Sequence, residues 1–316
     1  MSGFSFSLHD AAPPSAAVEI LGSRVSGVVV EDRGGRPVVS AHATEVLPDQ
    51  ALVPALNTAN VRDRVAVASA LGRVLERLGR PSRIGLVVAD PVAKVSLVKL
   101  QQVPARAHDL EQVIRWQVKK TAPFAIEDAQ VGYVAGIRAD DGQEFLVTLA
   151  RRDVIAEYEG LCSAAGAQAG IVDISTFNVV NAAVAASVVP AGDWLLVNVA
   201  PGWESIAILR GAHVIFFRSH SADGEGTLAD VVHQTAMYYE DRLQGAGFTR
   251  ALLCGAAASG EADVLRRSLA ERLSTTVDII DPTKAASLAD RVAASGELLD
   301  TLTPLVGMLL RSREAA

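Results

Sequence analysis

The feature that most constrains the fold is an internal repeat, in which two parts of the chain open with the same order of short apolar strands and tight turns. Residues 17–43 read as strand, turn, strand, turn and strand, and residues 194–218 repeat that order at nearly the same spacing. A helix and a further strand follow each copy, as in an α/β unit. The repeat therefore predicts two related α/β lobes that face a cleft, with two unrelated α/β domains as the alternative.

A block between the two copies interrupts the first lobe and predicts a small fold of its own. Residues 94–103 alternate as a strand, residues 109–120 follow the helical period before Pro123, and Asp140-Asp141-Gly142 indicates a hairpin between two further strands. The chain then divides into a first lobe, an insertion and a second lobe, which we place at residues 1–92 plus 170–190, 93–169 and 191–316.

The composition indicates a soluble globular protein that does not bind nucleic acid. Half of the residues are hydrophobic, the formal net charge is −7, and the densest basic spots are pairs such as Arg151-Arg152. The two cysteines, Cys162 and Cys254, lie far apart, which favours a reducing compartment over a disulfide framework. The N-terminus has no signal-peptide pattern and the apolar run 195–199 is too short to cross a bilayer, so we expect a cytoplasmic protein.

A search for catalytic motifs finds no P-loop, no G-x-S-x-G and no H-E-x-x-H pattern. The histidines are scattered, and His213 and His220 are interpreted as surface or core residues. The run Gly224-Glu225-Gly226-Thr227 opens a long helix, where free N–H groups could meet an anion. A plain loop with Thr227 as the N-cap explains the same residues.

Lobes with this order of strands resemble those of the actin, sugar-kinase and FtsA superfamily. In that superfamily each lobe's first hairpin reads like Asp-Ile-Gly, with the acid near Mg-ATP and the glycine near the phosphates. The corresponding residues here are Glu19-Ile20-Leu21 and Asn198-Val199-Ala200, and the Gly-Gly turn that meets the nucleoside corresponds to Gly255-Ala256. The resemblance implies an α/β protein with an actin-like (ribonuclease H-like) duplicated two-lobed fold and an inserted small α/β subdomain.

Both hairpins depart from the superfamily where phosphate binding depends on them. A phosphate nest needs close approach of the backbone, which glycine permits and which the side chains of Leu21 and Ala200 would obstruct. Asn198 also replaces an acid. We therefore expect nucleotide binding to be weak or lost, no cofactor and no catalytic residue. If ATP and Mg are bound after all, the resemblance places them near Glu19, Gly22, Ser23, Asn198, Gly202, Gly226, Gly255 and Ala256.

Within the superfamily the chain resembles the PilM-like type IV pilus assembly proteins, from about residue 17 to the last helix. The insertion carries the run 99–104, then a helix, Pro123-Phe124, the acids Glu127-Asp128 and Tyr133 in the following strand. The ending, Asp281-Pro282 followed by an apolar helix over residues 303–311, also resembles that family. The order of these features along the whole chain carries the resemblance.

The resemblance implies a cytoplasmic scaffold that is peripherally associated with the inner membrane. Such proteins bind the short N-terminal tail of a PilN-like bitopic membrane protein in a groove between the first lobe and the insertion, and link it to the pilus motor ATPase or platform protein. Apolar residues of the insertion are the candidate walls: Leu97, Leu100, Val113, Trp116 and Phe124, with Val118 beside them.

Two other functions stay open at this point. One is an active actin-like ATPase in which Glu19 positions Mg and the nucleotide state gates pilus or type II secretion assembly. The other is the cytoplasmic domain of a type II secretion protein such as GspL, which shares the fold. A protein of that kind would be expected to continue into a transmembrane helix, whereas this sequence ends at Ala316.

Overall fold

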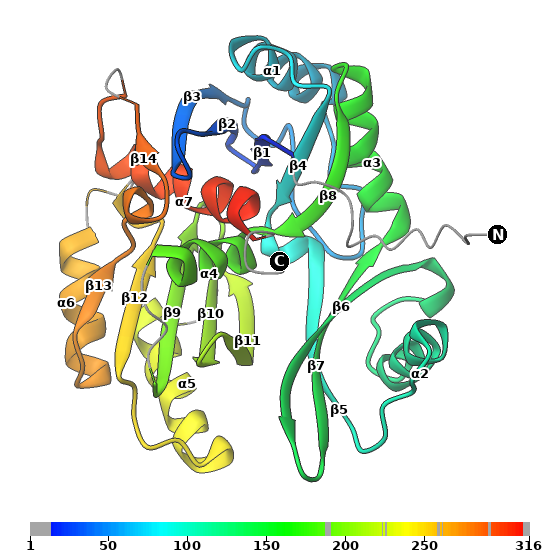
Figure 1. The fold of residues 1–316 in the computed structure, drawn as a ribbon, viewed down its shortest axis with the longest axis vertical. Helices are drawn as coiled ribbons and strands as arrows, with labels where there is room; N and C mark the ends of the chain where they lie inside the picture. Colours follow the sequence, from blue (N-terminus) through cyan, green and yellow to red (C-terminus); the bar gives the residue numbers. More distant parts are fainter. Residues whose placement is uncertain are drawn as a thin grey trace.

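The fold consists of three β-sheets with their helices, in a computed structural model that describes residues 14–186, 191–222, 224, 226–257, 260, 262–289 and 292–311. Two larger sheets form two lobes, and a smaller sheet with one helix projects from the first lobe (Figure 1). The predicted two-lobed α/β arrangement with an inserted subdomain is confirmed.

The first lobe is built on a six-stranded sheet in the order β14-β3-β2-β1-β4-β8. Helices α1 and α3 share one buried apolar cluster with this sheet, and α7 shares another with β1, β2 and β4. The elements are β1 (Ala16–Ile20), β2 (Arg24–Asp32), β3 (Pro37–Val46), α1 (Arg64–Arg77), β4 (Arg83–Val88), η1 (Asp90–Val92), α3 (Arg152–Ala164), β8 (Gln168–Ile174), β14 (Ser287–Leu288) and α7 (Gly296–Leu310).

The second lobe repeats the three-strand meander within a five-stranded sheet in the order β11-β10-β9-β12-β13. Helices α5 and α6 bury their apolar stripes on one face, and α4 packs Val179, Val180 and Ala183 on the other. The elements are α4 (Ser175–Ala186), β9 (Asp193–Ala200), β10 (Trp203–Arg210), β11 (His213–Ser221), α5 (Leu228–Leu243), β12 (Arg250–Cys254), α6 (Ala262–Leu273), β13 (Val277–Ile279) and η4 (Pro282–Lys284).

The insertion has a core of its own. Its three strands are ordered β5-β7-β6, and α2 covers the sheet with Ile114 and Val118, which are almost completely buried. Phe145 and Leu149 of the middle strand complete this core. The elements are β5 (Ala93–Leu100), α2 (Ala107–Lys119), η2 (Ile126–Asp128), β6 (Ala129–Ala139) and β7 (Gly142–Arg151).

The structure corrects the predicted boundaries between these parts. Helix α3 and the start of β8 were expected in the insertion, but α3 packs Val154, Tyr158 and Leu161 into the first lobe's core and β8 pairs with β4. The insertion therefore ends near Arg151. The chain end was expected in the second lobe, but β14 pairs with β3 and α7 packs on the first sheet. An amphipathic or apolar helix predicts that a face is buried, without indicating which sheet it covers.

Helix α7 also starts earlier than the expected residues 303–311. Ser295 caps it by accepting a hydrogen bond from Leu298 N (3.2 Å), and Pro304 lies inside the helix. Helix α7 crosses α4 closely, because a Cβ on Gly307 would lie 1.7 Å from the carbonyl oxygen of Asn178. Since α4 packs on the second sheet and α7 on the first, this crossing holds the two lobes together.

Candidate functional site

The two hairpins that correspond to phosphate-binding hairpins are packed directly against each other. Leu21, from the turn between β1 and β2, forms a buried apolar cluster with Ala89 and with Trp203 of β10, and Ala200 packs against them. Trp203 is only 3 % exposed. Sequence reasoning identified Leu21 and Ala200 but missed Trp203, although a large aromatic residue beside the second turn was a visible signal. With side chains in this space, the hairpins do not fit a triphosphate.

Glu19, the acid of the first hairpin, is buried and tied to groups of the protein. Its Oε1 accepts a hydrogen bond from Ser175 Oγ (2.9 Å), and Arg24 Nη2 lies 3.8 Å from its Oε2. Burial raises the pKa of Glu19, while Arg24 and the Ser175 hydrogen bond act against this rise. Arg24 would repel a second cation placed at Oε2. The carboxylate therefore takes part in an internal ion pair with Arg24, while its Oε2 accepts no hydrogen bond from the described residues.

A second buried acid, Asp90, joins the two lobes and was missed by sequence reasoning. Asp90 accepts hydrogen bonds from Thr176 N (3.0 Å) and from Thr176 Oγ1, and Asn198 Nδ2 of the second hairpin donates to the same Oγ1 (2.9 Å). Burial raises the pKa of Asp90 to about 6, against the hydrogen bonds from Thr176. Asn198 is therefore a link in an internal network. An acid two residues after the apolar strand 84–88 was the available signal.

The Gly255 turn serves packing inside the second lobe. Gly255 has a φ of +86°, and a Cβ there would lie 1.8 Å from the carbonyl oxygen of Val199. Ala256 is buried in the core beneath α5 and α6. Ala257 N donates to Asp300 Oδ2 of α7 (2.7 Å). This backbone N–H is therefore already hydrogen-bonded within the protein and is not free to bind an anionic ligand.

The remaining candidate cofactor residues lie in turns and caps. A Cβ on Gly22 would lie 3.1 Å from the carbonyl oxygen of Leu52, and the carbonyl of the neighbouring Ser23 accepts a hydrogen bond from Leu47 N. Gly226 precedes Thr227, which forms the N-cap of α5 in a capping box with Asp230. Glu225 of the same run lies outside the described residues. Gly202 (φ +87°) borders a cavity of about 750 Å³ beside β11, whereas Ala256 borders a different one. The structure does not gather the eight residues around one space.

A groove lies between the first lobe and the insertion. It has a volume of about 330 Å³, with β8, α3 and η1 on one side and β6 and β7 on the other. Consecutive residues of β6 (130–132) and of β8 (172–174) line the groove. Because alternate side chains of a strand point to opposite faces of its sheet, a groove that contacts consecutive residues lies along the edge of each strand. Within the described residues, β6 and β8 are the last strands of their sheets.

The groove walls are mostly apolar, with Ile155 and Val172 on the side of the first lobe and Val131 on the side of the insertion. Gln130 and Thr148 add polar side chains, and the exposed Gly132 adds backbone. The charged residues that line it are both acidic, namely Glu159 and Asp173. Burial raises the pKa of Asp173, although Arg311 Nη1 lies 2.6 Å from its Oδ2 and opposes the rise. The groove suits an extended, neutral or basic segment.

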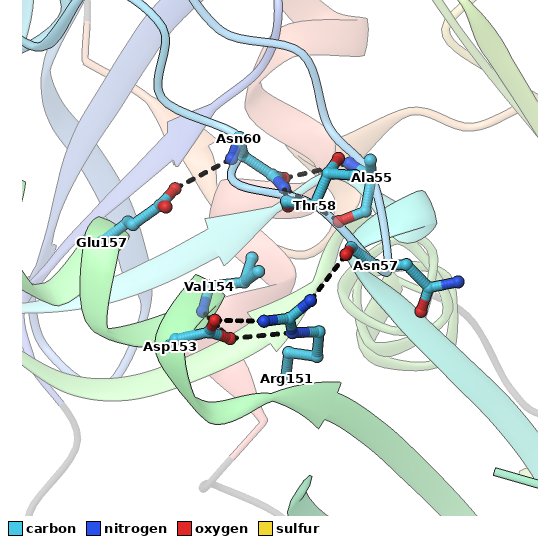
Figure 2. A network of polar contacts seen from close by, with 8 residues as sticks. All are labelled: Ala55, Asn57, Thr58, Asn60, Arg151, Asp153, Val154 and Glu157. Carbon is cyan, nitrogen blue, oxygen red and sulfur yellow. Dashed lines mark hydrogen bonds and ion pairs between the residues drawn. The ribbon is translucent and has the colours of Figure 1, made fainter. Parts of the chain in front are cut away.

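A polar network ties the end of the insertion and the start of α3 to the loop that contains Asn57 and Asn60 (Figure 2). Arg151, the last residue of the insertion, pairs with Asp153 at the start of α3 and donates to the carbonyl oxygen of Asn57 (2.6 Å). Asn60 in the same loop donates its N–H to Glu157 Oε2 of α3 (2.8 Å). Asn60 Oδ1 also accepts from the buried Tyr158 hydroxyl (3.0 Å). The strand that leaves the insertion is therefore clamped to the first lobe.

The five predicted partner-binding residues lie elsewhere on the insertion. Leu100 is 4 % exposed and belongs to the core of the insertion, and Val113 and Phe124 pack against that core. Leu97 and Trp116 are exposed, at 40 % and 65 %, away from the groove. Val118 is also a core residue. A role of Leu97 or Trp116 in partner binding stays a prediction, while the side chain of Leu100 is directed into the core.

Among the described residues no helix is long and apolar enough to cross a membrane. They contain no group of three or more His, Cys, Asp or Glu side chains placed to hold a metal ion.

Comparison with known proteins finds one family and several related folds. The family model described as type IV pilus assembly protein PilM matches residues 17–244. A solved structure described as a PilM-PilN type IV pilus biogenesis complex is similar, with a TM-score of 0.79, 16% identity and coverage of 95% of this chain and 98% of the other. No curated protein matches the sequence.

Two further solved structures are similar at lower scores. One is a Bacteroides thetaiotaomicron protein with an actin-like ATPase fold, with a TM-score of 0.52, 9% identity and coverage of 95% and 99% of the two chains. The other is the cytoplasmic domain of EpsL from the type II secretion system of Vibrio cholerae, with a TM-score of 0.50, 10% identity and coverage of 95% and 94%. These likenesses show that the fold is actin-like.

Proposed function

Since the chain belongs to the PilM family of type IV pilus assembly proteins, we propose that it is a non-catalytic adaptor of a pilus assembly machine. It binds the N-terminal cytoplasmic tail of a PilN-like inner-membrane protein in the groove between the first lobe and the insertion. Through this partner it associates with the inner membrane. In this position it connects the membrane complex to the pilus motor or platform protein.

The groove between two strand edges is the observation that carries this proposal. An extended segment laid along an exposed strand edge gains main-chain hydrogen bonds, and neighbouring pockets take its alternate side chains. Here the edges of β6 and β8 both border one apolar groove. The hydrogen bond from Arg151 to Asn57 ties the end of β7, a strand that lines the groove, to the first lobe, and a site that is ordered before binding lowers the ordering cost of association. The similar solved structure described as a PilM-PilN complex supports a partner of this kind.

The junction between the lobes supports an adaptor without nucleotide turnover. Trp203 and Leu21 pack where phosphates would have to enter, and Arg24 faces the one hairpin acid, Glu19. Catalysis of phosphoryl transfer depends on positioned metal ions and on donors aimed at the phosphates. Two backbone donors near this junction, Thr176 N and Ala257 N, are engaged by Asp90 and Asp300 of the protein itself.

A calorimetric titration of a synthetic PilN-type tail into two Thr148 variants tests the proposal. Thr148 lines the groove opposite Gly132, where its Oγ1 donates to the glycine carbonyl oxygen (3.3 Å). Thr148→Trp places an indole in the groove beside the glycine, and we expect tail affinity to fall at least about tenfold, or 1.4 kcal/mol. Thr148→Ser is the matched control and keeps binding within about twofold. Unchanged binding by Thr148→Trp, with an unchanged melting temperature, would exclude the groove as the site.

The same preparation tests the adaptor role against an ATPase role. We expect no ATP turnover and no thermal stabilisation by Mg-ATP in the protein that binds the tail. A turnover that Glu19→Ala abolishes would replace the adaptor by an active ATPase. Micromolar affinity for ATP in calorimetry would contradict the closed state of the hairpins.

A further inference from the structure

A second cavity, which we call the β11 cavity, lies between the second lobe, the insertion and the loop after β3. Its volume of about 750 Å³ is within the range of about 300–1,000 Å³ that is usual for ligand sites. Consecutive residues of β11 (217–221) and of β5 (93–95) line it. Within the described residues, β11 and β5 are the last strands of their sheets. The cavity therefore borders the edges of two strands.

The β11 cavity has a basic lining, although the formal net charge of the chain is −7. Lys94 of the insertion and Arg218 of β11 line it, and none of the described residues around it is Asp or Glu. In the part of the chain that the structure describes, neither cation lies within ion-pair distance of a carboxylate. Lys94 donates to the carbonyl oxygen of Thr121 instead. The β11 cavity therefore attracts negative charge, in contrast to the groove with its acids Glu159 and Asp173.

Two polar atoms in the wall of the β11 cavity have no hydrogen-bond partner among the described residues, namely Ser219 Oγ and His220 Nδ1. The other ring nitrogen, His220 Nε2, lies 3.2 Å from Oε2 of Glu204 and therefore carries the proton. Burial, and then Arg218, lower the pKa of His220, so the ring is neutral and Nδ1 can accept a hydrogen bond. Buried polar groups are rarely left unpaired, and a bound segment with N–H donors can supply the partner.

We propose that the β11 cavity binds an extended, acidic segment of a second protein partner along the edge of β11. Residues 217–221 offer about 16 Å of strand edge, which is enough for about five residues of an added strand. The strand edge supplies main-chain hydrogen bonds, and the acidic side chains of the segment pair with Lys94 and Arg218. The two edge strands of the insertion, β6 and β5, thus border two binding sites of opposite charge. This second site does not depend on the proposed function of the groove.

Two labelled synthetic peptides, built from Val-Glu repeats and from Val-Gln repeats, are the probes for this site. They are titrated into the full chain with fluorescence anisotropy as the readout. We expect the acidic peptide to bind about five- to tenfold more tightly than the neutral one, and Arg218→Glu to remove this preference. Arg242→Glu is the matched control, because it makes the same charge change at an exposed arginine of the second lobe that does not line the cavity. It should change affinity less than about twofold.

Hydrogen exchange and the groove variant Thr148→Trp locate the bound peptide. We expect the acidic peptide to slow exchange over residues 217–221, and Thr148→Trp to leave its affinity unchanged, because Thr148 lines the groove and not the β11 cavity. Equal affinities of the two peptides, equal losses with Arg218→Glu and Arg242→Glu, or unchanged exchange over residues 217–221 would each overturn the second site. The proposed function stands in all of these cases if the PilN-type tail still loses affinity with Thr148→Trp.

Discussion

Separate sheets meet at two places in this molecule, at the junction between the lobes and at the groove beside the insertion. The two places differ in whether their polar and backbone groups are paired within the protein. At the junction, apolar side chains fill the space, and Asp90, Asn198 and Thr176 satisfy one another. At the groove, two strand edges border an open apolar channel. A buried, internally paired interface provides rigidity, whereas an unpaired strand edge provides a place to bind another chain. The junction is thus filled with packed side chains, whereas the groove stays open along two strand edges.

Removal of the indole at the junction should have the largest effect. Trp203→Ala leaves a cavity between Leu21, Ala89 and Ala200, and we expect the free energy of unfolding to fall by about 4 kcal/mol. Trp116→Ala is the control, since Trp116 is 65 % exposed, and it should cost less than about 1 kcal/mol. Urea unfolding measures both. Equal losses would mean that the indole does not hold the hairpins together.

A comparison of two glycines tests whether the Gly255 turn is retained for packing. Gly255→Ala brings a Cβ against the Val199 carbonyl at a positive φ, and we expect a loss of about 3 kcal/mol. Gly79→Ala has a similar φ of +83° with no atom within 4 Å and should cost about 1 kcal/mol. Thermal unfolding distinguishes them, and a smaller loss for Gly255→Ala would contradict the close approach.

The pH dependence of stability tests whether Asp90 is a buried member of the junction. Its pKa of about 6 in the folded protein lies above the ordinary 3.8, so the folded state holds its proton more tightly than the unfolded state. The stabilisation by this proton is complete below about pH 4 and is lost as the pH rises through 6. Relative to Asp90→Asn, the free energy of unfolding of the unchanged protein should therefore fall by at most about 3 kcal/mol between pH 4 and 7. Parallel curves for the two proteins would contradict this.

Charge at the groove should have the smallest effect, because it only tunes binding. Glu159→Lys reverses an exposed acid at the groove, and we expect it to weaken binding of a basic PilN-type tail about two- to fivefold. Glu271→Lys makes the same charge change on α6, far from the groove, and should leave affinity unchanged. Calorimetry at low salt measures both, and equal effects would mean that net charge alone acts.

The sequence predicted the features that arise from local patterns. The meander of each lobe, the hairpin at Asp140-Asp141-Gly142 and the altered residues Leu21 and Ala200 all follow from neighbouring residues, and the structure has them. The groove could not be predicted in this way, because β6 and β8 come from separate segments and become edge strands only through the sheet order. Val113 of α2 was a candidate wall residue for the partner, but it packs against the core of the insertion. The periodicity of apolar residues predicts that one face of a helix is buried, but it does not identify the element that packs on that face.

Hydrogen exchange of the whole chain, with and without a PilN-type tail, tests the central claim most directly because it reports on both regions at once. An extended segment bound along strand edges protects the amides it pairs with. We expect the tail to slow exchange over residues 129–134 and 168–174, with no change over residues 198–205. Slowed exchange at the hairpins around Leu21 and Trp203, with none along β6 and β8, would contradict the claim.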